Sequence, residues 1–166
     1  MRRINHQIIS SLLVVFLGSL MTLSFAAEEG SSKSENVPDE KMQELNFYTA
    51  AKEGRLSQVK AMLSSGMNVN SKNSAGRTAL MGAAYNGNRS IVKELVADGV
   101  DVNLADEQGK TALMLAVANK RMDIVEVLLN AGADVTLADK KEKTAIIMAE
   151  KSKNKKLLKM LEAAAE

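Results

Sequence analysis

The chain of 166 residues contains no cysteine, no tryptophan, one proline and one histidine. Without cysteine it can form no disulfide, and it has no thiolate nucleophile and no cysteine ligand for zinc or an iron–sulfur cluster. The single histidine, His6, lies close to the N-terminus. If that end of the chain is removed, histidine-based catalysis and histidine metal sites are excluded as well. We therefore expect no metal site and no other cofactor.

Residues 1–26 have the organisation of a secretory signal peptide. Arg2 and Arg3 form a basic start, residues 8–23 form an uncharged apolar stretch, and small residues lead up to a cleavage site at Ala26. We predict cleavage after Ala26, with Ala27 as the alternative, and thus a periplasmic or secreted protein. The other interpretation is a retained inner-membrane anchor, because the uncharged residues 8–27 are numerous enough to span a bilayer. In either case only this segment would contact the membrane.

The net charge of the chain depends on this segment. The full chain has 22 basic and 20 acidic side chains. Removal of residues 1–26 takes away Arg2 and Arg3 and no acidic residue, which leaves 20 of each sign. A neutral chain lacks the positive surface that contacts phosphates, so we expect no nucleic-acid partner. Residues 27–44 carry six acidic and two basic groups. We expect a flexible acidic linker there, although Pro38 and the acidic residues after it suit the first turn of a helix.

Residues 45–166 repeat with a period of 33 residues. Three ladders of identical residues share this spacing: Thr78, Thr111 and Thr144; Gly66, Gly99 and Gly132; and Ala50, Ala83, Ala116 and Ala149. Coincidence does not account for three ladders at one period. A repeat of this length indicates a stack of similar structural units.

Each unit has the pattern of two short helices followed by a polar turn. In the second unit, Thr78 suits the N-terminus of a first helix, and the Asn-Gly-Asn sequence at residues 86–88 interrupts it. A second helix follows, with apolar residues spaced along one face. Gly99 ends it, because glycine readily adopts the left-handed conformation of a helix C-terminus. Residues 102–110 then form an extended polar turn.

These units resemble ankyrin repeats, most clearly in the sequences GKTALM at residues 109–114 and VEVLLNAGADV at residues 125–135. The resemblance is to small exported bacterial ankyrin-repeat proteins. It implies an all-α ankyrin solenoid of four stacked helix-turn-helix units with hairpin finger loops. The units are residues 45–77, 78–110, 111–143 and 144–166.

The chain departs from the family pattern at several positions. The proline and histidine of the family's Thr-Pro-Leu-His sequence are replaced by alanine and by methionine or isoleucine, which indicates apolar packing between units. Glu150 and Glu162 occupy positions that are apolar in the inner units, as expected of a terminal unit that faces water. Glu142 replaces the turn glycine found at Gly76 and Gly109. Because glutamate tolerates a positive φ poorly, we expect a distorted last finger.

Catalysis would have to rely on carboxylates or lysines in the finger turns, such as Asp101, Asp106 and Glu107. We expect these side chains to be exposed, and exposed groups with ordinary pKa values are poor acid–base catalysts. The chain also has no phosphate-binding loop, metal-ligand spacing or nucleophile motif. We therefore expect neither an enzyme nor a small-molecule substrate. A hydrolase based on finger carboxylates is a weaker hypothesis.

A protein-binding surface remains. The resemblance implies that partners contact the finger tips and the concave face of the first helices of each unit. Transferred by repeat position, this marks concave positions that include Ala118 and Lys151. From these positions we take ten partner-binding residues: Arg77, Tyr85, Asn86, Glu107, Gln108, Lys110, Asn119, Lys140, Lys141 and Lys143. Tyrosine and arginine are frequent hot-spot residues, although Tyr85 could instead cover a helix end. We expect a monomer, because four units are enough to fold alone.

Positive charge gathers at the C-terminal end. Residues 139–166 hold eight lysines and five acidic residues. Two interpretations fit this excess. Lysines keep a terminal unit soluble, or they steer the chain toward a partner with an acidic patch. We favour solubility as the simpler of the two.

Overall fold

The computed structural model describes residues 39–166. The predicted signal peptide, its cleavage site and most of the acidic linker lie outside the described residues. The described part contains helices and no strands, so the predicted all-α repeat fold is confirmed. The helices are α1 (Asp39–Lys52), α2 (Leu56–Ser64), α3 (Ala79–Asn86), α4 (Arg89–Ala97), α5 (Ala112–Ala118), α6 (Met122–Asn130), α7 (Ala145–Lys151) and α8 (Lys155–Ala163).

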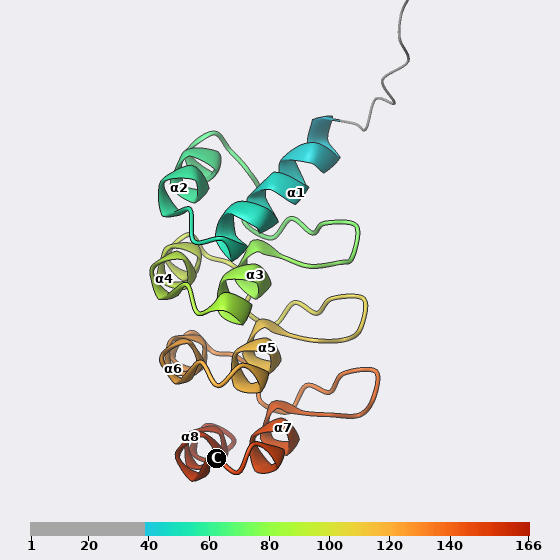
Figure 1. The fold of residues 1–166 in the computed structure, drawn as a ribbon, viewed down its shortest axis with the longest axis vertical. Helices are drawn as coiled ribbons and strands as arrows, with labels where there is room; N and C mark the ends of the chain where they lie inside the picture. The colour runs from blue at the N-terminus through green and yellow to red at the C-terminus, as the bar shows by residue number, and fades with distance from the viewer. Residues whose placement is uncertain (1–38) are drawn as a thin grey trace, which may run out of the picture. The chain divides into compact units, whose positions relative to one another are not determined.

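The helices form consecutive pairs whose members stack on their equivalents in the next pair (Figure 1). Helix α3 packs between α1 and α5, and α5 packs in turn against α7. In the other column, α4 packs between α2 and α6. Three loops project beside the odd-numbered helices (Figure 1). We call them finger 1 (residues 65–78), finger 2 (residues 98–111) and finger 3 (residues 131–144), and we call the surface of the odd-numbered helices and fingers the concave face.

The repeated threonines begin the first helix of each later pair. The backbone N–H of Met81 donates to Thr78 Oγ1 at 3.4 Å, and the N–H of Met114 donates to Thr111 Oγ1 at 3.3 Å. Thr144 makes the same bond in the last unit. A side-chain acceptor at this position satisfies a backbone donor that has no partner within the helix. The predicted threonine caps are confirmed.

Helix α1 begins earlier than the repeat pattern indicates. It starts at Asp39 and so includes residues 39–44, which the sequence places in the linker. The helix-start signal after Pro38 accounts for this extension. Phe47 and Ala51 of α1 are fully buried, because α1 packs against the side of α3 that faces away from α5.

The core runs as one continuous layer between the two columns of helices. Leu80, Met81, Leu113 and Met114 are each about 1% exposed. Burying a side chain of this size contributes about 1.5–3 kcal/mol, so the methionines in the family's histidine position add to the stacking of units. Glu150 is exposed, whereas the residues at the same repeat position in the inner units are buried. The polar end of the stack is therefore confirmed.

Finger 3 is not distorted, and that expectation was wrong. Glu142 adopts a φ of 57°, and the N–H of Glu142 donates to the Asp139 carbonyl at 2.8 Å. Gly109 makes the same bond at 2.9 Å in finger 2. A Cβ at Gly109 would lie 3.0 Å from the backbone nitrogen of Lys140 in the next finger. No finger follows finger 3 in the described residues, so a side chain at Glu142 meets no such obstacle.

None of the helices within residues 39–166 is both long enough and apolar enough to cross a membrane.

Candidate partner-binding surface

One side chain at the same repeat position holds each finger turn in shape. The three residues are Asn73, Asp106 and Asp139. Each uses Oδ1 to accept hydrogen bonds from the backbone N–H groups two and four residues further along, at 2.8–3.0 Å. The donors are the backbone N–H groups of Ala75, Arg77, Gln108, Lys110, Lys141 and Lys143. Five of these six are predicted site residues, so their backbone is fixed before any partner arrives.

The expectation that the finger carboxylates are exposed is wrong for Asp106. Asp101 and Glu107 are exposed, but Asp106 is only 7% exposed. Its Oδ1 is occupied by two backbone N–H groups and its Oδ2 faces Arg77. A carboxylate held in this way supports the turn and is poorly placed to exchange protons with a substrate. Within residues 39–166 no three acidic or histidine side chains gather where they could hold a metal ion.

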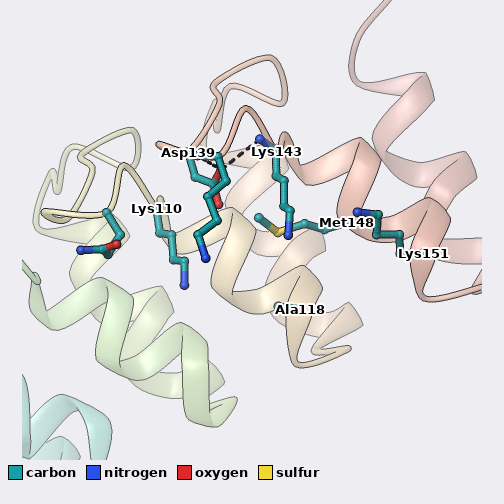
Figure 2. A pocket seen from close by; sticks show the side chains of 8 residues that line it. Lys110, Ala118, Asp139, Lys143, Met148 and Lys151 are labelled. Carbon is teal, nitrogen blue, oxygen red and sulfur yellow. Dashed lines mark hydrogen bonds between the residues drawn. The ribbon is translucent and has the colours of Figure 1, made fainter.

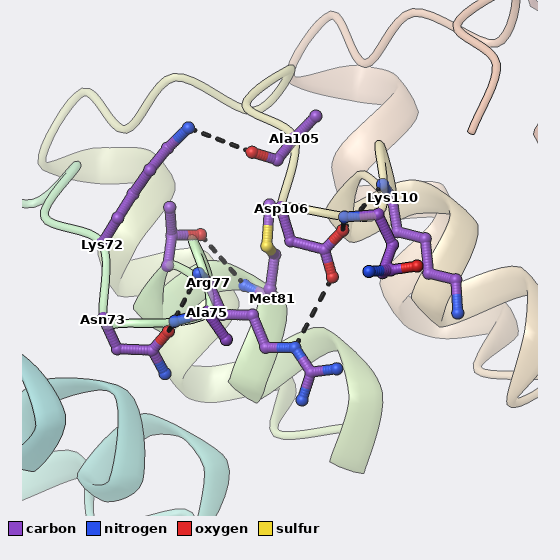
Figure 3. A network of polar contacts seen from close by, with 10 residues as sticks. Lys72, Asn73, Ala75, Arg77, Met81, Ala105, Asp106 and Lys110 are labelled. Atoms are coloured by element: carbon purple, nitrogen blue, oxygen red, sulfur yellow. Dashed lines mark hydrogen bonds and ion pairs between the residues drawn. The ribbon is translucent and has the colours of Figure 1, made fainter. Parts of the chain in front are cut away.

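Arg77, at the end of finger 1, interacts with both helix α1 and finger 2. Its Nε lies 3.5 Å from Oδ2 of Asp106, whose side chain is 1% exposed (Figure 3). No hydrogen-bond donor contacts that Oδ2 in the described part of the chain. Hydrogen bonding with the Tyr48 side chain of α1 is the main cause that raises the pKa of Arg77 above its ordinary value, and the charge of Asp106 adds to it. Arg77 is thus a structural bridge as well as a surface residue.

The fingers are also tied directly to one another. The Lys72 ammonium donates to the Ala105 carbonyl at 3.0 Å (Figure 3). The N–H of Glu107 donates to the Ala75 carbonyl at 3.3 Å, and the N–H of Lys140 donates to the Gln108 carbonyl at 2.9 Å. These bonds join each finger to the next and limit their independent movement.

Tyr85 lies at the end of α3 and is 46% exposed. One turn earlier, Gly82 packs closely against Tyr48 and Lys52 of α1. The glycine lets the two helices approach closely, and Tyr85 follows one turn later in α3. About half of its surface remains available to a partner. Its neighbour Asn86 donates through Nδ2 to the Lys52 carbonyl at 2.6 Å, so that amide closes the end of α1.

The Asn119 side chain makes a similar hydrogen bond at the end of α5, where its Nδ2 donates to the Leu115 carbonyl at 2.8 Å. The two predicted asparagines therefore have structural roles that the sequence did not reveal. Glu107 and Lys140 lie at finger positions that are exposed to solvent.

Four of the predicted site residues come together in a cavity of about 330 Å³ between fingers 2 and 3 and helices α5 and α7 (Figure 2). We call this cavity the lysine groove. Its lining consists of Gln108, Lys110, Ala118, Asp139, Lys141, Lys143, Met148 and Lys151. The structure does not bring Arg77, Tyr85 and Asn86 into it, because they belong to finger 1 and α3. Lys151 stands 66 residues after Tyr85 and 33 after Ala118. The transfer by repeat position marks Ala118 and Lys151 as concave positions, and the structure places both in the groove.

The comparisons with known proteins agree with this architecture. A family model described as ankyrin repeats in three copies matches residues 47–139. The chain belongs to the ankyrin repeat family. The matched residues extend from α1 into finger 3, and the last helix pair continues the same stack. A search of curated proteins finds no match to this chain. Ankyrin repeats are in general protein–protein interaction modules without catalytic activity.

Proposed function

We propose that this chain is an exported, non-enzymatic module that binds a protein partner through its concave face. One observation carries the proposal. None of the ten predicted contact residues is buried, and each comes from a finger or from the C-terminal end of an odd-numbered helix. Accessible side chains on a shared framework are what a binding surface requires.

The rigidity of the framework supports this function. Within each finger, the Asn or Asp side chain accepts hydrogen bonds from the backbone, and backbone hydrogen bonds join neighbouring fingers. Together these hydrogen bonds fix the positions of the contact residues. A surface that is ordered before binding loses less conformational entropy when the partner arrives. The fingers are therefore suited to recognition of a folded or extended protein surface.

The absence of suitable catalytic groups favours binding over catalysis. Beyond His6 the sequence contains neither histidine nor cysteine. The buried carboxylates Asp106 and Asp139 are engaged in the finger turns. The described residues thus offer no pair of groups arranged as acid and base, and the hydrolase hypothesis gains no support.

Capture of the partner tests the proposal. The purified chain would be immobilised and exposed to an extract of its source cells, and bound proteins identified by mass spectrometry. The variant Tyr85→Ala changes the concave face, and Glu126→Ala, at an exposed position of α6, is the matched control. We expect the Tyr85 variant to recover less partner than wild type and the control to recover the same amount. Equal recovery by both variants would remove Tyr85 from the binding site.

The exported location is a proposal from the sequence. We propose that residues 1–26 direct export and are then cleaved, which places the repeats in the periplasm or outside the cell. N-terminal sequencing of the native protein tests this directly. A start at Ala27 or Glu28 supports cleavage and release. A start at Met1 or Arg2 contradicts it and supports a repeat scaffold tethered to the membrane.

A further inference from the structure

Basic residues and carboxylates alternate along the fingers. Arg77, Lys110 and Lys143 occupy the same repeat position, one at the end of each finger. Each of the first two has a carboxylate in the following finger. Arg77 forms an ion pair with Asp106. The backbone N–H of Lys143 is the main cause that lowers the pKa of Asp139, and the charges of Lys143 and Lys110 add to it. Within the described residues no finger follows Lys143, so Lys143 has no carboxylate in a following finger and shares Asp139 with Lys110.

The lysine groove therefore has an excess of positive charge. Lys110, Lys141, Lys143 and Lys151 line it, and Asp139 is its only acidic residue (Figure 2). Asp139 already accepts two backbone hydrogen bonds through Oδ1. Among residues 39–166 none of the four lysines forms an ion pair within 4.0 Å. Like charges that line one cavity repel one another, and an anion placed in the cavity relieves that repulsion.

We propose that the lysine groove binds an acidic segment of the partner protein, with aspartate or glutamate carboxylates received between the lysines. The inference deepens the proposed function, on which it rests, by naming the chemistry of the partner. Met148 and Ala118 give the groove an apolar portion against which the methylene groups of a glutamate can pack. The Gln108 amide offers both a donor and an acceptor to a peptide backbone.

The lining favours a peptide over a nucleic acid. No aromatic residue and no arginine lines the groove, so bases have nothing to stack on and phosphates have no bidentate partner. Lysine ammonium groups are compact charges that pair readily with single carboxylates. The complementary charge would also steer the partner toward this end of the concave face.

The structure separates two groups among the C-terminal lysines. Lys141, Lys143 and Lys151 line the groove, whereas Lys156 and Lys159 are exposed on α8 and do not line it. Solubility of the terminal unit explains the lysines of α8. It does not explain why the others gather around one cavity, and this convergence favours the binding interpretation there.

Binding of a labelled acidic peptide tests the inference. The probe is a fluorescein-labelled peptide of alternating glutamate and alanine, and the control peptide has glutamine in place of each glutamate. Fluorescence anisotropy would measure the affinity of the purified chain for both peptides at low and moderate salt. The groove variant is Lys143→Glu with Lys151→Glu, and the matched control is Lys156→Glu with Lys159→Glu. Both pairs change the net charge equally. Lys151→Gln alone is a milder second variant, and circular dichroism checks that every variant is folded.

We expect the glutamate peptide to bind and the glutamine peptide to bind far more weakly. The groove pair should weaken glutamate-peptide binding about tenfold or more, Lys151→Gln should weaken it to a smaller degree, and the α8 pair should change it less than about twofold. Equal weakening by the two pairs would overturn the inference, because only net charge would then matter. The absence of glutamate-peptide binding would also overturn it. As a nucleic-acid control, a labelled oligothymidine is measured in the same way, and tighter binding of the oligothymidine than of the glutamate peptide would overturn the inference too. If acidic-peptide binding fails while partner capture still depends on Tyr85, the inference falls and the proposed function stands.

Discussion

Arg77 Nε lies 3.5 Å from Oδ2 of Asp106, an oxygen that is buried and has no hydrogen-bond donor within the described residues. The contact joins the end of finger 1 to the turn of finger 2. It makes Arg77 a poor choice for a simple test of partner binding, because its removal leaves a buried carboxylate oxygen without its cation.

We predict that Arg77→Ala lowers the free energy of unfolding by about 1–3 kcal/mol, because the buried carboxylate loses its counter-charge; this lies between the cost of losing an exposed ion pair and that of leaving a fully buried charge unpaired. Asp106→Asn should keep the finger turn, because Asn73 makes the same two Oδ1 bonds in finger 1. In the Asp106→Asn background, Arg77→Ala should cost much less. Urea unfolding of the four proteins in this double-mutant cycle measures the coupling. Strictly additive effects would show that the ion pair contributes nothing.

Asp139 makes the stability of finger 3 dependent on pH. The backbone N–H of Lys143 is the main cause that lowers the pKa of this carboxyl below its ordinary value of 3.8. A lowered folded-state pKa means that the ionised carboxylate stabilises the fold fully above the unfolded-state pKa. That stabilisation is lost as the pH falls through the folded-state value.

Asp139→Asn should therefore remove this acid dependence while keeping the turn. Asp139→Ala, which loses both hydrogen bonds, should lower stability near neutral pH by about 1–3 kcal/mol. Unfolding free energies of the wild type and both variants, measured near neutral pH and below pH 3.8, test the prediction. If acid destabilises the asparagine variant as steeply as the wild type, another group is responsible.

The tight approach of neighbouring fingers predicts unequal costs for two glycine substitutions. Gly99 and Gly109 both have a positive φ, so alanine strains the backbone at either site by about 1–2 kcal/mol. At Gly99 an added Cβ meets nothing within 4 Å, whereas at Gly109 it meets the backbone of Lys140 at 3.0 Å. Gly109→Ala should therefore cost about 1–3 kcal/mol more than Gly99→Ala in thermal or urea unfolding. Equal costs would mean that the fingers separate easily.

Glu142 adopts a left-handed backbone conformation, which is strained for any residue other than glycine. The equivalent positions of the other fingers are Gly76 and Gly109. We predict that Glu142→Gly raises the free energy of unfolding by about 0.5–1 kcal/mol, because the relief of strain exceeds the added entropy of the unfolded chain. A variant less stable than wild type in urea unfolding would show that the Glu142 side chain makes a favourable contact.

Tyr85→Ala should leave the fold intact. The side chain is 46% exposed and lies at the end of α3, so we expect a loss of at most about 1 kcal/mol. Thermal unfolding checks this before any capture experiment. A larger loss would indicate that Tyr85 mainly covers the helix end, and reduced partner recovery by the variant would then carry no information about contact.

The sequence predicted the features that each unit contains within itself. Threonine caps such as Thr78, the glycine that ends the second helix and the buried methionines all arise from local patterns that recur every 33 residues. Features that depend on the contact between neighbouring units were not predicted. The buried carboxylate of Asp106 has its ion-pair partner, Arg77, in the preceding finger. The regular shape of finger 3 depends on the space beside Glu142, where no further finger packs in the described part of the chain.

The candidate site likewise contains residues that the sequence predicted correctly and structural roles that it did not predict. The family resemblance, transferred by repeat position, marked Gln108, Lys110, Lys141 and Lys143 as contact residues, and the structure places them in one groove. It also assigns structural hydrogen bonds to Asn86 and Asn119. Those bonds reach backbone carbonyls, and a sequence pattern does not indicate which carbonyls need a donor.

The central claim is that the concave face contacts a protein partner. Its most direct test is lysine acetylation of the chain, read by mass spectrometry with and without the captured partner. We expect the partner to protect Lys110, Lys141 and Lys143, while Lys156 and Lys159 of α8 react equally in both states. Protection of the α8 lysines with unchanged reactivity in the fingers would place the partner on the opposite side and contradict the claim.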